Sequence, residues 1–151
     1  MHAFVTAATG FLLAVLWFDL MFDVQMRGHD EEILPAEVLT SISTYYRRVT
    51  TDAFPMNRLV AAFMLVNLIA IVAEIVTASV PGWIAWGSLA IAGSGIVPSL
   101  RRTVPNAVRL GSRVDTPAEQ SVLARSIYRA HKSAFARMSA VLGLQLCVVW
   151  L

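Results

Sequence analysis

Four long apolar segments dominate this chain of 151 residues and limit the folds open to it. A helix needs about 20 mainly apolar residues to cross the hydrocarbon core of a bilayer. The segments that meet or approach this length are 4–22, 57–80, 83–98 and 134–151. Hydrophobic residues make up 57% of the chain and charged residues only 15%, where a soluble domain has about 25% charged. The sequence therefore predicts an all-α, polytopic membrane protein, with one four-helix transmembrane bundle over 1–151.

The basic residues predict the orientation of these helices. All 12 lysines and arginines fall in the segments 23–57 and 99–133 or in the first turns of the second and fourth helices. Cytoplasmic loops of membrane proteins are enriched in lysine and arginine, so both segments are expected to be cytoplasmic. We therefore predict a multi-pass protein of the cell (inner) membrane with both termini on the non-cytoplasmic side.

Two further helices are predicted in the cytoplasmic segments. Apolar residues recur every three or four positions from Val38 to Val49, which is typical of an amphipathic helix over about 35–52. Thr116 and Glu119 have the spacing of a capping box, and Pro117 suits the first position of a helix. The fourth helix is therefore expected to begin near Pro117, so that a cytoplasmic part over 117–133 makes it unusually long.

Composition excludes several classes of function. The formal net charge is only +2, so the broad basic field of a nucleic-acid-binding protein is missing. The single cysteine, Cys147, cannot form an intramolecular disulfide or a multi-cysteine zinc site. No P-loop, dinucleotide-binding motif or nucleophile elbow is present in the sequence. The expected partners are the lipid bilayer and either a second copy of the chain or a larger membrane complex, with no nucleic acid.

Polar residues near the cytoplasmic end of the apolar segments form the first candidate site. Asp19 and Asp23 are four residues apart in the first helix, so both side chains lie on one face. His131 lies on the inward apolar stripe of the last helix at a similar depth. One interpretation is that Arg58 or Arg137 neutralises the two carboxylates. The other is that the cluster binds a cation or a proton.

A metal site is a further hypothesis for the same end of the protein. His29 begins an acidic run, and His29, His131 and Asp23 are the candidate ligands, because imidazole and carboxylate groups bind several divalent metals. The chain has no Glu-x-x-His spacing of the di-iron kind. The alternative is that the acidic run is a solvated loop.

Glu74 is the acidic residue most difficult to place, because the outer half of the second helix has no basic residue near it. Asn67 lies seven residues earlier, two turns away on the same face, and could continue a polar line towards Arg58. We expect Glu74 to point into the bundle or into a subunit interface, with hydroxyl, amide or water contacts. Ser88 and Thr77 are the hydroxyl partners considered.

Several short motifs carry a resemblance to a known family. They are Gly10-Phe11-Leu12-Leu13, Pro55-Met56-Asn57-Arg58, Val104-Pro105-Asn106 and Tyr128-Arg129-Ala130-His131. In order and spacing they resemble the anthrone oxygenase-like group of small four-helix membrane proteins. The resemblance implies that Asn57 and Arg58 match that group's polar positions at the head of the second helix, and that Asn106 and His131 match those before and at the head of the final helix. Asp19 and Asp23 depart from the family pattern, which has no carboxylates at the end of the first helix.

Three classes of function remain open at this point. A protein that binds or transports a small ligand or ion would use Asp19, Asp23, Asn67, Glu74 and His131 to line an internal site. An accessory subunit of a membrane complex would use its apolar faces to dock. The alternative is a membrane-embedded oxidoreductase or oxygenase-like enzyme that acts on a lipophilic substrate through His131 and Asn106, with a metal, a haem or no cofactor.

Overall fold

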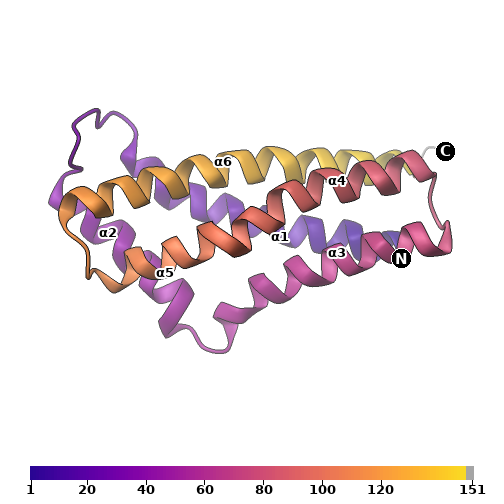
Figure 1. The fold of residues 1–151 in the computed structure, drawn as a ribbon, viewed down its shortest axis with the longest axis horizontal. Helices are drawn as coiled ribbons and strands as arrows, with labels where there is room; N and C mark the ends of the chain where they lie inside the picture. The colour runs from indigo at the N-terminus through magenta and orange to yellow at the C-terminus, as the bar shows by residue number, and fades with distance from the viewer. Residues whose placement is uncertain (149–151) are drawn as a thin grey trace.

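The computed structural model describes residues 1–148, which form helices and no β-strand (Figure 1). The α-helices are α1 (His2–Asp23), α2 (Ala36–Arg47), α3 (Leu59–Thr77), α4 (Gly82–Pro98), α5 (Val104–Ser112) and α6 (Pro117–Cys147). Shorter helical turns are η1 (Val24–Met26), η2 (Arg48–Asp52), η3 (Met56–Arg58) and η4 (Ser99–Thr103).

Among residues 1–148, three helical stretches are long and apolar enough to cross a membrane: His2–Met26, Met56–Thr77 and Gly82–Ser112. Their outward faces carry large apolar side chains that no other part of the chain covers, such as Ile69 at 66% exposure and Val76 at 79%. A soluble protein seldom exposes so much continuous apolar surface. The helical fold expected from the sequence is confirmed at this level, as is the presence of helices long and apolar enough to span a membrane.

The third apolar stretch is longer than the predicted segment 83–98. The helix continues past Pro98 through the π-helical turn η4 into α5, so that 31 residues from Gly82 to Ser112 form one bent rod. Pro98 and Pro105 each lack an amide hydrogen and cannot donate to the carbonyl four residues earlier, which loosens the regular pattern on both sides of η4.

The long helix α6 connects the two ends of the molecule. Its 31 residues span about 46 Å. The C-terminal half packs beside α1 and α4, and the N-terminal half packs against α2 and α5. The predicted fourth apolar segment, 134–151, forms this C-terminal half, and its last three residues lie outside the described residues. The beginning of α1, the turn between α3 and α4, and the end of α6 lie at one end of the molecule, opposite α2 and α5 (Figure 1).

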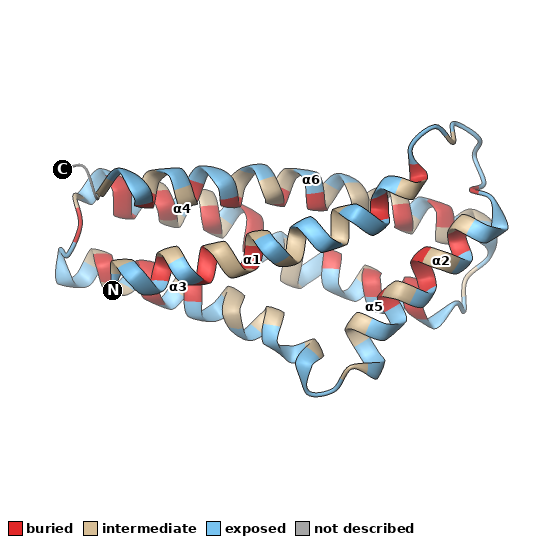
Figure 2. Cartoon of the chain, turned by 180° about the vertical axis from the view of Figure 1, so that it is seen from behind, coloured by how far each residue is buried: buried red, intermediate tan, exposed pale blue. Residues whose placement is uncertain are grey.

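Two larger groups of buried apolar residues hold the helices together, and a third, smaller group that includes Ile84 lies at the turn between α3 and α4. One joins α2, α5 and the start of α6 and includes Ile42, Leu110 and Ile127, and the other joins α1, α3, α4 and α6 and includes Ile71 and Val141. Figure 2 shows the buried residues on the inward faces and exposed residues on the outward faces. In the first group α2 and α5 approach closely at a glycine.

Gly111 explains that close approach. A Cβ atom at Gly111 would lie 2.6 Å from the backbone nitrogen of Arg47 on α2, closer than non-bonded atoms can come. Only glycine therefore fits at this position of α5 without moving α2 away.

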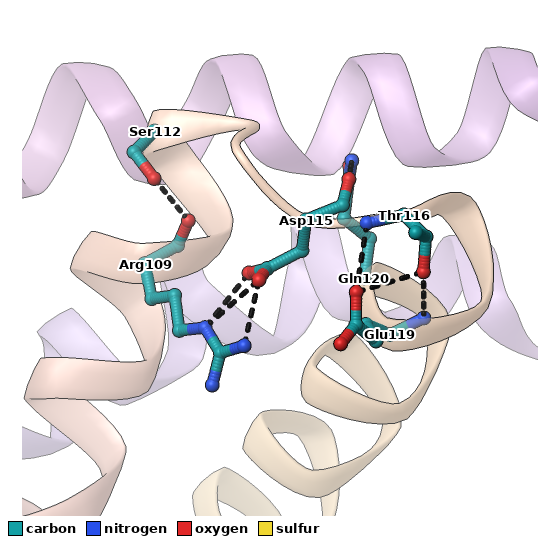
Figure 3. Close-up of polar contacts among 6 residues, drawn as sticks. All are labelled: Arg109, Ser112, Asp115, Thr116, Glu119 and Gln120. Carbon is teal, nitrogen blue, oxygen red and sulfur yellow. Dashed lines mark hydrogen bonds and ion pairs between the residues drawn. The ribbon is translucent and has the colours of Figure 1, made fainter.

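Figure 3 shows how the chain turns from α5 into α6. Arg109 donates to both oxygens of Asp115 through Nε, at 3.1 and 2.8 Å, and through Nη2 at 2.6 Å. The capping box predicted from the sequence is confirmed: the Glu119 amide donates to the Thr116 hydroxyl, and the Thr116 amide donates back to Glu119. The Thr116 amide and hydroxyl both donate to the Glu119 carboxylate, and these two bonds hold its pKa below the usual range. The start of α6, and with it the position of His131, is fixed by this turn.

Candidate functional site

Asp23, at the end of α1, lies at the centre of a buried polar cluster. Its carboxylate has no exposed surface. The hydroxyl of Tyr46 donates to Oδ1 at 2.6 Å, and Nδ1 of His131 lies 2.8 Å from Oδ2. Hydrogen bonds to both oxygens compensate for removing the charge from water. Asp23 therefore orients a tyrosine from α2 and a histidine from α6.

Asp19 lies one helical turn earlier and joins the same cluster. The hydroxyl of Tyr45 donates to its Oδ1 at 2.7 Å, and Oδ2 is 3.9 Å from Nε2 of His131. The side chains of Asp19, Asp23, Tyr45, Tyr46 and His131 are called the carboxylate cluster below. The sequence-based expectation that Asp19, Asp23 and His131 meet at one depth is confirmed.

The two tyrosines act as hydrogen-bond donors in this cluster. Burial raises the pKa of the Tyr45 phenol, and the adjacent Asp19 carboxylate raises it further. Burial and Asp23 raise the pKa of Tyr46 in the same way. Both phenols keep their protons at neutral pH, so each can stabilise the carboxylate that it faces.

The arginine partners proposed from the sequence were wrong. No lysine or arginine nitrogen among residues 1–148 lies within 4 Å of the Asp19 or Asp23 carboxylate. Arg58 is exposed and lies over the ring of Phe54, with 5.0 Å between its Cζ and the ring centroid. The side chain of Arg137 packs beside Gly95 instead. Tyrosine hydroxyls stabilise the carboxylates without the cost of burying a guanidinium ion.

A cavity of about 440 Å³ lies against the carboxylate cluster. Its wall includes parts of α1, α2, α3, α4, α5 and α6, with α3 forming one side from Leu59 to Met64. Asp19, Tyr45, Tyr46 and His131 form part of the wall, and most of the rest is apolar. The cavity therefore combines a large apolar volume with one group of hydrogen-bonding side chains.

Two π-helical turns complete the cavity wall. Val49 and Thr50 come from η2, and Ser99 and Thr103 come from η4. Asn57 joins them, and its Nδ2 donates to the carbonyl of Thr50 at 2.9 Å. Single π turns occur frequently at functional sites because they redirect side chains within a helix.

Glu74 belongs to a second polar group at the opposite end of the helices. Nε2 of Gln145 donates to Glu74 Oε2 at 3.0 Å and lies 3.1 Å from the Ser88 hydroxyl. Nδ1 of His2 is 2.9 Å from the Gln145 side-chain oxygen. Glu74 points into the protein with an amide contact, as expected, and Ser88 is reached through Gln145. Thr77, the other partner considered, bonds to the carbonyl of Ala73.

Asn67 continues this polar group along α3 for two turns. It is fully buried and its oxygen accepts from the hydroxyl of Thr9 at 3.3 Å. Asn67 Nδ2 and Glu74 Oε1 are buried without a hydrogen-bond partner among the described residues. The expected continuation to Arg58 is not found, because Arg58 faces outward at the far end of the helix.

The remaining candidates lie apart from the carboxylate cluster. His29 is 3.9 Å from Glu31 in the segment before α2, and in the described part of the chain no three histidine, cysteine or acidic side chains are grouped to hold a metal ion. Asn106 lines a small groove of about 160 Å³ between η4, α5 and α6, which also contains Arg102 and Ser126.

Three important polar residues were not identified as site residues from the sequence. Tyr45 belongs to the apolar stripe of α2, where its spacing indicates only an apolar helix face, and the spacing does not single out Tyr46. Gln145 lies 14 residues after His131, which places both on the same face of α6, so extending that stripe would have found it. A buried tyrosine needs a partner for its hydroxyl, and this rule could have linked Tyr45 and Tyr46 to the nearby acids.

Comparison with known proteins adds no relative: no family model, curated protein or solved structure matches the chain.

The geometry of His131 determines what the site can do chemically. With Nδ1 donating to Asp23, the second ring nitrogen is left to face Asp19 at 3.9 Å. That separation is too long for a direct hydrogen bond. When Nε2 also carries a proton, a hydroxyl placed between the two groups accepts from Nε2 and donates to the Asp19 carboxylate. The arrangement is therefore suited to receive a hydroxyl group from a molecule in the cavity.

Proposed function

We propose that this is an integral membrane protein that binds a small, mainly apolar molecule bearing a hydroxyl group. In this proposal α1, α3, the rod of α4 and α5, and the C-terminal half of α6 form a four-helix transmembrane bundle. Apart from Arg58 and Arg137, the basic residues lie on or next to η1, α2, η2, η4, α5 and the N-terminal half of α6, the elements at or near the end of the molecule that contains α2 and α5. The positive-inside rule places that end in the cytoplasm and both termini outside.

The cavity is the observation that carries this proposal. Its volume of about 440 Å³ falls within the roughly 300–1,000 Å³ typical of small-molecule sites. Such sites combine an apolar lining with a few placed polar groups, as this one does. The volume is far larger than a single ion or water needs, which favours an organic ligand over an ion.

The carboxylate cluster supplies the specificity in this proposal. The ligand hydroxyl lies between Nε2 of His131 and Oδ2 of Asp19, while its apolar body fills the space between α1, α3 and α5. Asp19 is already held by Tyr45 and His131 by Asp23, so binding requires little reorganisation of the polar groups.

A second candidate is an enzyme that acts on the same kind of ligand. The Asp23 and His131 pair favours it, because a carboxylate bonded to Nδ1 leaves Nε2 able to accept a proton. His131 would then take the proton of the bound hydroxyl onto Nε2 and leave the lipophilic substrate as its oxyanion. The resemblance to the anthrone oxygenase-like group supports this reading. The binding function is proposed first because the cavity alone supports it.

Binding of 2-naphthol and of its methyl ether, 2-methoxynaphthalene, tests the proposed function. A hydrogen bond to a charged partner is worth about 1.5–3 kcal/mol, so the purified protein should bind 2-naphthol about tenfold or more tightly than the ether. The variant Asp19→Asn keeps the acceptor for Tyr45 but loses the charge, and the preference for the hydroxyl should shrink to a few fold. Equilibrium dialysis in detergent measures both constants.

The matched control is Asp30→Asn, an exposed acid outside the cavity. Its preference for 2-naphthol should equal that of the unchanged protein. Equal binding of naphthol and ether by the unchanged protein, or an undiminished preference in Asp19→Asn, would contradict the assigned role of Asp19.

A further inference from the structure

The exposed residues of the cavity wall indicate the route by which a ligand reaches the cavity. Five lining residues are exposed: Phe18, Met56, Leu59, Val104 and Val108. All five are apolar, whereas the polar lining residues are buried or half-buried. These five residues are called the apolar mouth below. An opening used from water would expose polar groups, and this one does not.

The apolar mouth also lies on the parts of the chain that can cross a membrane. Phe18 belongs to the stretch His2–Met26, Met56 and Leu59 begin the stretch Met56–Thr77, and Val104 and Val108 belong to Gly82–Ser112. Side chains that are exposed on such helices face lipid when the helices are in a bilayer. Val104 and Val108 lie beside Arg101 and Arg109 at the cytoplasmic end of their stretch, so the mouth opens at the cytoplasmic edge of the hydrocarbon.

Phe54 and Arg58 fix the depth of the mouth. Both are exposed next to it, and the Arg58 guanidinium lies over the Phe54 ring. An arginine near the end of a membrane-spanning helix extends its guanidinium to the headgroups while its alkyl stem lies along apolar surface. The mouth accordingly lies just below the cytoplasmic headgroups, and the start of α3 forms one side of it.

We propose that the ligand is a bilayer-dissolved amphiphile that enters sideways through the apolar mouth, with its hydroxyl reaching the carboxylate cluster and its hydrocarbon tail remaining in the mouth. This inference rests on the proposed function and adds the class of ligand and its route. The polarity of the wall sets the orientation: hydrogen-bonding groups lie inside and only apolar groups lie at the rim. A long tail is compatible with the site because it need not fit within the cavity.

Three probes with the same hydroxyl-bearing ring test the route in lipid nanodiscs. They are 2-naphthol, 6-hexyl-2-naphthol with a tail opposite the hydroxyl, and 2-naphthol-6-sulfonate with a permanent charge at that position. The protein should bind the hexyl probe within about threefold of 2-naphthol when both are expressed as mole fraction in lipid. The sulfonate should bind at least tenfold more weakly, because its charge would lie in the apolar mouth.

A pair of tryptophan variants on α3 tests whether the hexyl tail passes through the apolar mouth. Leu59→Trp narrows the mouth and should weaken binding of the hexyl probe at least tenfold, with a change below threefold for 2-naphthol. Val76→Trp adds the same ring on the same helix at an exposed position far from the cavity and should change neither.

The outcomes separate this inference from the proposed function. Binding of 2-naphthol together with exclusion of the hexyl probe, or with equal binding of the sulfonate, overturns the lateral route and leaves the binding function standing. An undiminished affinity of Leu59→Trp for the hexyl probe also overturns the route. Failure of 2-naphthol itself to bind overturns the proposed function, and the route with it.

Discussion

Replacement of Asp23 by alanine is expected to destabilise the protein by about 3 kcal/mol, the largest effect of any single change in the carboxylate cluster. The substitution leaves the hydroxyl of Tyr46 and Nδ1 of His131 buried without their shared partner. Loss of one member of a buried charged group costs about 3–5 kcal/mol. The His131 imidazole that remains in the variant is neutral, which keeps the cost near the lower limit. For a chain of this size the midpoint of thermal unfolding should fall by roughly 6–12 °C.

The control for this measurement is Asp30→Ala, which removes an exposed aspartate from the segment before α2. Surface substitutions of this kind usually change stability by less than about 0.5 kcal/mol. Scanning calorimetry of both variants in the same detergent gives the comparison. Equal unfolding midpoints for the two variants would show that Asp23 does not hold α1, α2 and α6 together.

Replacement of Ala61 by phenylalanine is expected to abolish ligand binding without unfolding the protein. Ala61 lines the cavity from α3, and the added ring would occupy the space assigned to the ligand. Affinity for 2-naphthol should fall more than tenfold. The unfolding midpoint should stay the same or rise, because filling an existing cavity does not force neighbouring side chains apart.

Ala62→Phe is the matched control, since it adds the same ring one position along α3 on the exposed side. It should bind 2-naphthol like the unchanged protein. If both phenylalanine variants keep full affinity, the ligand binds outside the cavity. If both lose affinity, the substitutions have disturbed α3 as a whole, and the loss does not locate the ligand in the cavity.

The helical fold was predictable because its causes are local in the sequence. Apolar runs of sufficient length determine which helices can enter a bilayer, and the capping box at Thr116 and Glu119 determines where α6 begins. The continuation of the third helix past Pro98 was not predicted. A proline in a sequence usually predicts the end of a helix. In the structure, the π turn η4 after Pro98 allows the helix to bend and continue.

The candidate site was predictable only in part. Asp19, Asp23 and His131 could be placed at one depth because helical rise converts sequence position into distance along the axis. Their partners could not be identified in this way, because α2 lies outside the apolar segments and its packing angle decides whether tyrosines or arginines reach the carboxylates. Side chains from six helices line the cavity, so the residue spacing within any single helix could not predict it.

The position of a bound ligand tests the central claim most directly. In a crystal structure of the complex with 6-bromo-2-naphthol, the anomalous signal of bromine locates the ring independently of the surrounding density. We expect a bromine peak within the cavity on the side of Leu59 and Val108, with the hydroxyl within hydrogen-bonding distance of His131 Nε2 or Asp19 Oδ2. A bromine peak on the outer surface of the helices, or in the groove beside Asn106, would contradict it.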